Sequence, residues 1–423
     1  MNKNVKYFFV IFFCFIAFHV NAQNDQRTIK SFDPFIQSCL ADVNSDSLYS
    51  YTLSLQSFGT RYCLADNRKS VALWLAAKLE SFGYNTIIDS FPCTFEIHIN
   101  DGGGTFHVVL TQYNVIGTLW GTQNPAATYI LGAHYDSFAG WDSITNPLIS
   151  APGADDNATG VAAFLEISRI LKARNYCPKY SIEFIGFAAE ELMGSSYSGS
   201  KHYAHLCDSL NKDIKMMINA DMLGYPGDTT NTVNIMGYIG HEWISALADT
   251  LRLQYCSINS QIYNDQKVWD AYPFWADSFP AIGFIERNPS FNPNYHKVTD
   301  IVDNIDFDYF REITKLIFAL LLDRVPFDSA AGVSPIDLEN SLTIYPNPCN
   351  EYIWIKYLGE EQKSPLTIEI RDLMNRRVFS TFVQDGILPI RLTIPEIKPS
   401  IYYIYLLNKN GVLTGLKKFV KIE

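Results

Sequence analysis

From residue 23 to about residue 330 the sequence alternates short apolar stretches typical of strands with amphipathic stretches typical of helices. Thr128–Ala133 and Tyr180–Ala189 are apolar and strand-like, whereas Ala158–Lys172 carries apolar residues at helical spacing. This alternation predicts an α/β fold in which helices pack on a mostly parallel sheet. It also constrains function, because ligands of such sheets bind at the carboxyl ends of the strands.

Histidine and acidic residues stand where the predicted strands end. His134 follows the first apolar stretch, Glu190 and Glu191 follow the second, and Asp221 follows a third. Five short segments carry candidates of this kind: GAHYD at 132–136, GADDN at 153–157, AEE at 189–191, NAD at 219–221 and YH at 295–296. Two imidazoles, three carboxylates and one further glutamate suit two divalent metals and a general base.

Each segment can be given a chemical task. A two-metal site needs a carboxylate shared by both metals, and Asp155, in a glycine-rich loop that opens a helix, is the natural candidate. His134 can supply an imidazole while Asp136 holds the other nitrogen of that ring. Asp221 and His296 complete the expected metal ligands.

The adjacent pair Glu190 and Glu191 divides naturally between two tasks. One side chain can bind metal while the other takes a proton from the reacting water as general base. Such pairs commonly form a solvated helix face, but this one follows a buried strand. Burying two carboxylates without a cation is costly. The pair therefore favours a metal site.

Longer stretches around these residues resemble the M28 family of zinc-dependent aminopeptidases. They are GAHYDS at 132–137, PGADDNATG at 152–160, AAEE at 188–191, GSKHYA at 199–204, NADMLG at 219–224, PFW at 273–275 and NYHKVTD at 294–300. The resemblance implies two zinc ions (Zn2+), with His134 and Asp221 on one and Glu191 and His296 on the other. Asp155 would bridge them.

The same resemblance assigns further roles. It implies Glu190 as general base, Asp136 as the group that orients the zinc-binding histidine, and Tyr295 as a phenol that stabilises the oxyanion. The dipeptide 155–156 matches one that is commonly cis in the family. One position departs from the pattern, since Ala271 stands where the family often has histidine. That segment lines the substrate side, so the side-chain preference stays open.

The implied activity is removal of N-terminal residues from peptides with a free N-terminus by a metal-bound hydroxide. An alternative is a glutaminyl cyclase, a transferase on the same fold with one zinc. A second alternative is a catalytically inactive ectodomain used for binding, although such domains usually lose ligands. The formal net charge of -11 argues against nucleic acid as a partner.

The sequence pattern changes after a proline-containing linker at residues 331–340. Residues 341–423 show strand-like runs separated by turns, which predicts a small all-β, sandwich-like domain. The IYPNP stretch at 344–348, the IEIRD strand at 368–372 and the KKFVK end at 417–421 resemble the type A sorting domain of the type IX secretion system. The resemblance implies binding to that secretion machinery, export across the outer membrane and removal of this domain.

Export is also predicted at the other end of the chain. Residues 1–22 have a basic start, an apolar run and a small-residue cleavage site, as in a signal peptide, so the catalytic domain is expected at 23–330. No later segment is long and apolar enough to span a bilayer. The expected location is therefore outside the cell or on its surface, reached through the periplasm. Seven cysteines follow the signal, and either one to three disulfides or buried thiols are compatible with them.

Overall fold

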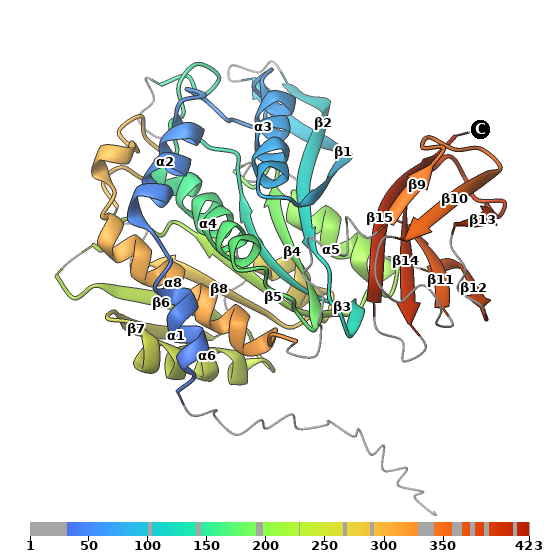
Figure 1. Ribbon diagram of the computed structural model, residues 1–423. Helices are drawn as coiled ribbons and strands as arrows, with labels where there is room; N and C mark the ends of the chain where they lie inside the picture. Colours follow the sequence, from blue (N-terminus) through green and yellow to red (C-terminus); the bar gives the residue numbers. More distant parts are fainter. Residues whose placement is uncertain are drawn as a thin grey trace, which may run out of the picture. The chain divides into compact units, whose positions relative to one another are not determined.

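The computed structural model describes residues 32–99, 104–140, 145–191, 198–227, 229–264, 269–287, 292–328, 342–357, 366–372, 377–384, 389–408 and 413–422. The predicted signal peptide and linker lie outside these residues and stay predictions. Eight strands form one sheet in the order β1-β2-β4-β3-β5-β8-β6-β7 (Figure 1). They are β1 (Asn85–Ile99), β2 (Gly104–Leu119), β3 (Asn124–His134), β4 (Tyr180–Phe187), β5 (Ile214–Asp221), β6 (Thr232–Gly237), β7 (Asn259–Asn264) and β8 (Ala281–Glu286).

The centre of the sheet is parallel, and antiparallel pairs lie toward its sides. β3 pairs in parallel with both β4 and β5, and β5 pairs in parallel with β8. β1, β2 and β4 pair antiparallel, as do β6 and β8. The predicted mostly parallel α/β sheet is confirmed. The parallel centre matters for function because it brings the ends of β3, β4 and β5 to the same edge.

Helices cover both faces of this sheet. They are α1 (Pro34–Leu40), α2 (Ser45–Gln56), α3 (Arg68–Ser81), α4 (Gly160–Ala173), α5 (Gly199–Ser209), α6 (Glu242–Tyr255), α7 (Ala271–Ala276) and α8 (Phe307–Arg324). The larger apolar core joins one face to residues of α2, α3, α4, α6 and α8, as Figure 1 shows for α2, α4 and α8. A second core on the other face includes Tyr203 of α5 and Phe274 of α7.

The sequence of α8 shows why a helix forms there. Asp306 caps its start, where the carboxylate accepts hydrogen bonds from the backbone N–H groups of Asp308 and Tyr309. Arg324 stands in the last turn, where a cation interacts favourably with the helix dipole. A run of apolar side chains between these ends is buried in the larger core. The residues of α8 thus favour a helix that begins at Phe307 and ends at Arg324.

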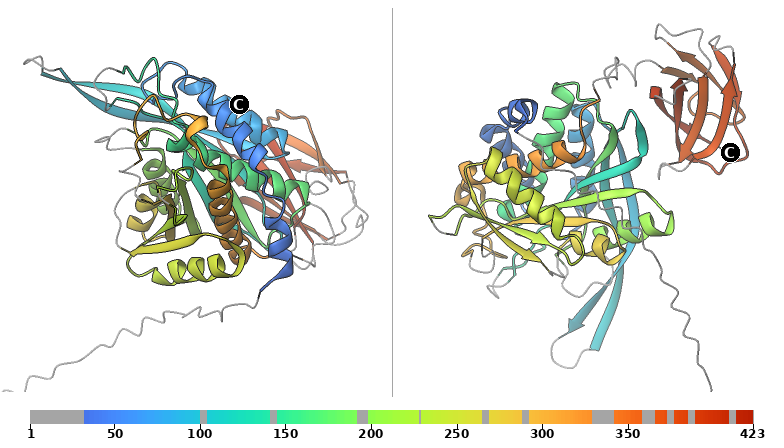
Figure 2. Two further views of the ribbon diagram at one scale, coloured as in Figure 1. Left: turned by 90° about the vertical axis from the view of Figure 1, so that its left-hand side faces the viewer. Right: turned by 90° about the horizontal axis from the view of Figure 1, so that it is seen from below.

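The antiparallel hairpin of β1 and β2 is one feature of the sheet that the sequence analysis did not predict, as are strands β6 and β7. The paired register of the hairpin runs from Asn85 opposite Thr118 to Ile99 opposite Gly104. Figure 2 shows the hairpin extending past the other strands of the sheet. β1 is an edge strand, which accommodates Pro92, because proline has no N–H to donate to a second neighbour.

The C-terminal part is all-β, as predicted. One sheet has the order β13-β10-β9 and the other β12-β11-β14-β15. Apolar residues of both sheets, such as Ile355 and Ile404, share one core, which makes a sandwich. Its strands are β9 (Leu342–Tyr345), β10 (Tyr352–Tyr357), β11 (Leu366–Asp372), β12 (Arg377–Val383), β13 (Ile390–Thr393), β14 (Ser400–Asn408) and β15 (Leu413–Lys421).

Two further predictions concern membranes and cysteines. Within the described ranges no helix is both long enough and apolar enough to cross a bilayer. The seven cysteines after the signal are present as thiols, and six of them are buried. Of the two possibilities left open by the sequence, the structure has the buried thiols.

Candidate metal centre

The site is assembled at the carboxyl ends of three adjacent strands. His134 is the last residue of β3 and Asp221 the last residue of β5. Glu190 and Glu191 lie just beyond the end of β4, which pairs with β3. Because β4, β3 and β5 are neighbours and parallel, their ends place these side chains together, as the sequence predicted.

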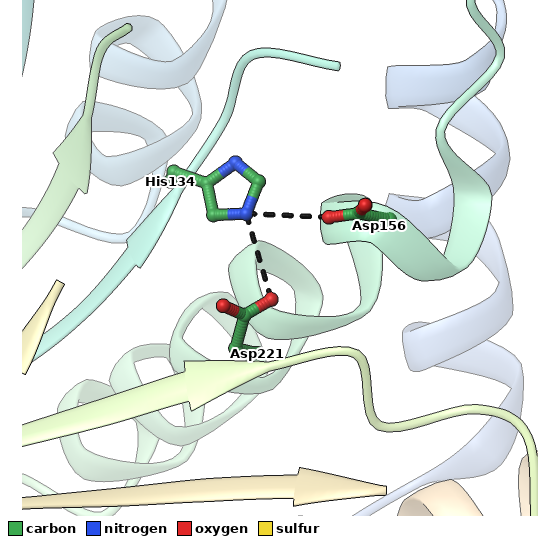
Figure 3. A group of neighbouring side chains, drawn as sticks. All are labelled: His134, Asp156 and Asp221. Atoms are coloured by element: carbon green, nitrogen blue, oxygen red, sulfur yellow. Dashed lines mark ion pairs between the residues drawn. The ribbon is translucent and has the colours of Figure 1, made fainter. Parts of the chain in front are cut away.

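Two groups of side chains converge there, and one carboxylate belongs to both. In the first group, drawn in Figure 3, His134 Nε2 lies 3.3 Å from Asp156 Oδ1 and 3.5 Å from Asp221 Oδ1. In the second, His296 Nε2 lies 3.2 Å from Asp156 Oδ2 and 2.9 Å from Glu191 Oε2. All five side chains are buried. The two oxygens of Asp156 thus point to different histidines.

The assignment of Asp155 as the shared carboxylate is therefore wrong, and Asp156 holds that position. Asp155 belongs to neither group of ligands. Its Oδ1 accepts a hydrogen bond of 2.7 Å from the backbone N–H of Gly224, and its Oδ2 accepts one of 2.9 Å from the Asn292 amide. These bonds connect the loop that carries Asp156 to the segments after Asp221 and before His296.

The expected cis peptide bond is also one residue away from its predicted place. The bond between Asp156 and Asn157 is cis, rather than the bond between Asp155 and Asp156. Both carboxylates lie in η1 (Ala154–Thr159), where residues 156 and 157 have non-helical backbone angles. The direction of each side chain therefore depends on loop geometry that residue types alone do not specify.

Left-handed backbone conformations surround the ligands. Ala189, just before the glutamate pair, has φ of 60°, Met222, just after Asp221, has φ of 47°, and His296 itself has φ of 55°. Non-glycine residues rarely adopt such angles, and where they do the strain is frequently tied to a functional site. The surrounding structure therefore holds these residues in strained backbone conformations.

Asp136 organises the glutamate pair as well as His134. Its Oδ1 lies 3.5 Å from His134 Nδ1, so the predicted contact between this carboxylate and the imidazole is present. Its two oxygens accept hydrogen bonds of 3.1 Å from the backbone N–H groups of Glu190 and Glu191. One buried carboxylate thus fixes the end of β3 against the segment after β4.

The two glutamates have different surroundings. Glu191 is 6% exposed and belongs to the second group of ligands. The Glu190 side chain is 26% exposed, belongs to neither group, and has its Oε2 4.0 Å from His134 Nε2. Glu190 is therefore beside the site but directed partly toward solvent, where a substrate or water can reach it.

Charge–charge interactions perturb the titration of these groups in the metal-free protein. Burial alone would lower the pKa of His296, but Asp156 and Glu191 raise it to about 10. Burial raises the pKa of Glu191 to about 7 despite the hydrogen bond from His296. Burial would likewise raise the pKa of Asp156, but the two histidines hold it below its usual value. Burial would also lower the pKa of His134, but Asp221 raises it well above its usual value, so both imidazoles stay protonated in the metal-free protein.

The arrangement fits metal ions better than it fits protons alone. Glu191 Oε1 is buried without a hydrogen-bond partner among the described residues, a costly condition that a cation would relieve. The ligand atoms within each group lie within 4.8 Å of one another. Imidazole and carboxylate donors are those that zinc takes in catalytic sites.

Tyr295 and Ala271 have different surroundings. The Tyr295 ring stacks on His296 with centroids 3.9 Å apart. Burial, and then Asp156, raise the pKa of Tyr295 well above its usual value, so the phenol keeps its proton. Ala271 is fully buried in the second apolar core, and nothing in its position shows what replaces the usual histidine.

Sequence reasoning assigned no role to several residues that hold the site. Asp300 accepts hydrogen bonds from the backbone N–H groups of Asp155 and Asp156, at 2.8 and 3.0 Å. It ends the NYHKVTD stretch, so its place near His296 was a usable signal. The amide of Asn292 donates to Asp155 at 2.9 Å and to Glu286 at 3.0 Å, and neither Asn292 nor Glu286 forms a recognisable pattern with Asp155 in the sequence.

Comparison with known proteins agrees with this geometry. Residues 114–321 match peptidase family M28, and residues 343–422 match the secretion system C-terminal sorting domain. The chain carries an M28 peptidase domain. All five candidate ligands lie within residues 114–321. The predicted C-terminal sorting domain is confirmed by the match to residues 343–422.

Individual relatives of the M28 domain are distant. A probable zinc metalloprotease of Pyrenophora teres f. teres is 28% identical over 324 residues, which cover 67% of this chain and 65% of that protein. Leucine aminopeptidase 1 of Ajellomyces capsulatus is 26% identical over 309 residues, covering 68% and 73%. The Legionella pneumophila LapA aminopeptidase has the same fold, with a TM-score of 0.55 and 20% identity over 70% of this chain and 76% of that one.

Proposed function

We propose that this protein is an exported zinc exopeptidase that removes residues from the N-terminus of peptides. One zinc ion would be held by His134, Asp156 and Asp221, and a second by Asp156, Glu191 and His296. The observation that carries the proposal is the carboxylate of Asp156, whose two oxygens face the two histidines at 3.3 and 3.2 Å. Zinc bound there would supply a Lewis acid and a water of lowered pKa.

Glu190 is the proposed general base. Its carboxylate is beside the ligands, is not needed by either group, and is partly exposed. Burial raises its pKa well above the usual value in the metal-free protein, which suits a group that accepts a proton near neutral pH. Glu190 would take the proton of the attacking water and then deliver it to the leaving amine.

The substrate's free N-terminus would be recognised by charge, since carboxylates crowd this site. An apolar cluster of Met222, Met236 and Ile285, with Tyr263, Trp269 and Tyr295 packed against it, begins one residue from Asp221 and from His296. We propose that it favours an apolar first side chain. The phenol of Tyr295, which stays protonated, would donate a hydrogen bond to the oxyanion.

Export by the type IX secretion system would follow from the sorting domain at residues 343–422. A peptidase delivered to the cell surface or beyond would act on peptides outside the cell. The signal peptide predicted at residues 1–22 would bring the chain to the periplasm first. Immunoblotting of culture supernatants from cells with and without residues 343–422 would test this route, and equal secretion would contradict it.

Digestion of a synthetic peptide library, followed by mass spectrometry, tests the activity. The expected products lack the first residue, arise preferentially from peptides with apolar N-termini, and disappear after chelation and dialysis. N-terminally acetylated copies of the same peptides are the control and should stay intact. Cyclisation of N-terminal glutamine with one zinc per chain would instead establish the cyclase, and failure to bind zinc would establish a binding ectodomain.

The base assignment has a matched pair of variants. Glu190→Gln should retain wild-type zinc content and lose about 10²- to 10⁴-fold in kcat, the usual contribution of a general base. Glu191→Gln, the adjacent change with the same chemistry, should lose zinc as well as activity. Wild-type turnover by Glu190→Gln would show that another group takes the proton.

A further inference from the structure

A buried arginine from outside the M28 match contacts the backbone of two segments that carry candidate metal ligands. Arg61 precedes the matched residues 114–321 and is only 2% exposed. Its guanidinium donates three hydrogen bonds of 2.7 Å, from Nε to the carbonyl of Tyr135, from Nη1 to Pro152 and from Nη2 to Gly153. A planar guanidinium can hold several acceptors in one fixed arrangement, which a lysine cannot reproduce.

The three carbonyls belong to the two segments that carry metal ligands. Tyr135 lies between His134 and Asp136, and Gly153 lies three residues before Asp156. The guanidinium therefore ties the end of β3 to the loop of the shared carboxylate. His134 Nε2 and Asp156 Oδ1, which lie 3.3 Å apart, belong to these two segments, so their separation depends on how the segments are held together.

The backbone of the same segment strengthens the connection. The N–H of Arg61 donates to Ser137 Oγ at 3.1 Å, and that hydroxyl donates to the carbonyl of Ala151 at 2.7 Å. Ala151 in turn donates its N–H to Gly59 at 2.9 Å. The segment 59–61 thus joins the two ligand-bearing segments through both its side chain and its main chain.

The contact between the Arg61 guanidinium and the loop requires a glycine at position 153. Gly153 has a φ of +55°, and a Cβ placed on it would lie 2.9 Å from Arg61 Nη2 and 2.4 Å from Ser137 Cβ. A side chain at position 153 would therefore push the guanidinium away. The absence of a Cβ is needed for the contact as well as for the backbone angle.

Electrostatics explain why a charged group is tolerated there. Burial lowers the pKa of Arg61 to about 10, while Asp300, Asp136, Asp156 and Glu191 favour the charged form. The guanidinium therefore stays positive at neutral pH. It offsets part of the repulsion among these buried carboxylates without being a ligand itself.

We propose that Arg61 is a positioning residue of the metal centre, whose guanidinium sets the separation between His134 and Asp156. The inference rests on the proposed zinc peptidase function. The three hydrogen bonds of the Arg61 guanidinium go to backbone carbonyls rather than to the side chains of the proposed ligands. Arg61 acts through the two segments it holds together, so its loss should change how metal is held before it changes whether the chain folds.

Arg61→Lys in the full-length zinc-loaded enzyme is the test, because lysine keeps the charge but not the three-way fork. We expect kcat to fall about 10- to 100-fold with KM within about threefold, as small misplacements of reacting groups cost this much. Zinc content after dialysis should fall below the wild-type value. With Co2+ in place of zinc, the visible absorption spectrum should shift, which reports altered coordination directly.

Arg324→Lys is the matched control. Arg324 is also buried, but it pairs with Asp323 in α8 and lies over the ring of Trp243. It should lower the melting temperature and leave zinc content and the Co2+ spectrum unchanged. If Arg61→Lys behaves in the same way, Arg61 only supports folding and the inference is wrong.

Ser137→Ala covers the case in which Arg61→Lys does not fold. It removes the acceptor of the Arg61 N–H and the donor to Ala151, and leaves the guanidinium in place. A smaller shift of the Co2+ spectrum in the same direction is expected, and a wild-type spectrum would overturn the inference. If wild-type protein binds no zinc, the proposed function fails first, which distinguishes the two failures.

Discussion

Replacing Asp156 with asparagine should damage metal binding far more than the same change at Asp155. The two residues are adjacent aspartates, and both are buried. Asp156 oxygens lie 3.3 Å from His134 Nε2 and 3.2 Å from His296 Nε2, so one side chain serves both groups of ligands. Asp155 instead accepts hydrogen bonds from Gly224 and Asn292.

The expected magnitudes follow from these contacts. Groups that support metal ligands from outside typically contribute 10- to 100-fold in metal affinity or activity. Asp155→Asn keeps an oxygen that can accept from Gly224, so we expect a loss of about 10-fold, at the lower end of that range. Asp156→Asn removes a negative charge from both groups at once. Its loss in kcat/KM should exceed about 100-fold, which is about 2.7 kcal/mol of transition-state stabilisation.

The assay compares both variants with wild type under one set of conditions. Zinc per chain is measured by plasma mass spectrometry after dialysis, and kcat/KM with a chromogenic amino-acid anilide. Circular dichroism confirms that each variant is folded. Loss of zinc by Asp155→Asn together with wild-type zinc content in Asp156→Asn would refute the placement of the shared carboxylate.

Three further predictions concern protons, the phenol and the support of Asp155. The pKa values of His296 (about 10) and Glu191 (about 7) are raised in the metal-free fold, so that fold keeps protons that the unfolded chain releases. The stability of the metal-free fold should therefore fall as pH rises from 4.5 to 10. The zinc-induced increase in melting temperature, measured by calorimetry, should grow over the same range. A zinc effect independent of pH would contradict this. Tyr295→Phe should lower kcat by about 100-fold with zinc content unchanged, measured by steady-state kinetics, if the phenol donates to the oxyanion. Asn292→Ala removes the amide shared by Asp155 and Glu286 and should cost about 1–3 kcal/mol in urea unfolding, whereas an unchanged midpoint would show that the amide is dispensable.

Much of the fold followed from local patterns. The helix over 307–324 has its own cap, apolar run and terminal cation, so residues close together in the sequence specify its boundaries. The β1–β2 hairpin was missed because its pairing joins residues up to 33 positions apart, as Asn85 and Thr118 do. Pro92 also argues against a strand unless the strand is at an edge, and edge position is a property of the whole sheet.

The candidate site, like the fold, could be predicted from the sequence only in part. Residue types and their places in the sequence pointed to His134, Glu191, Asp221 and His296, and the structure brings these side chains together; that they bind metal stays a prediction. The choice between Asp155 and Asp156 could not be made, because neighbouring side chains leave a non-helical loop in directions fixed by its backbone angles. Arg61 was out of reach for another reason, since its partners are backbone carbonyls, which carry no sequence signature.

The buried charges of this centre make metal binding and folding one problem. Near the ligands, the structure buries more carboxylates than cationic side chains. The acids include Asp136, Asp155, Asp156, Glu191, Asp221, Asp270, Glu286 and Asp300, and the bases include Arg61, His134 and His296. Burying unbalanced charge is expensive, so the metal-free fold retains protons on its histidines and on part of its acids. Two divalent cations would release those protons and supply the missing positive charge. Zinc bound there would therefore stabilise the folded chain by the same interactions that prepare it for catalysis.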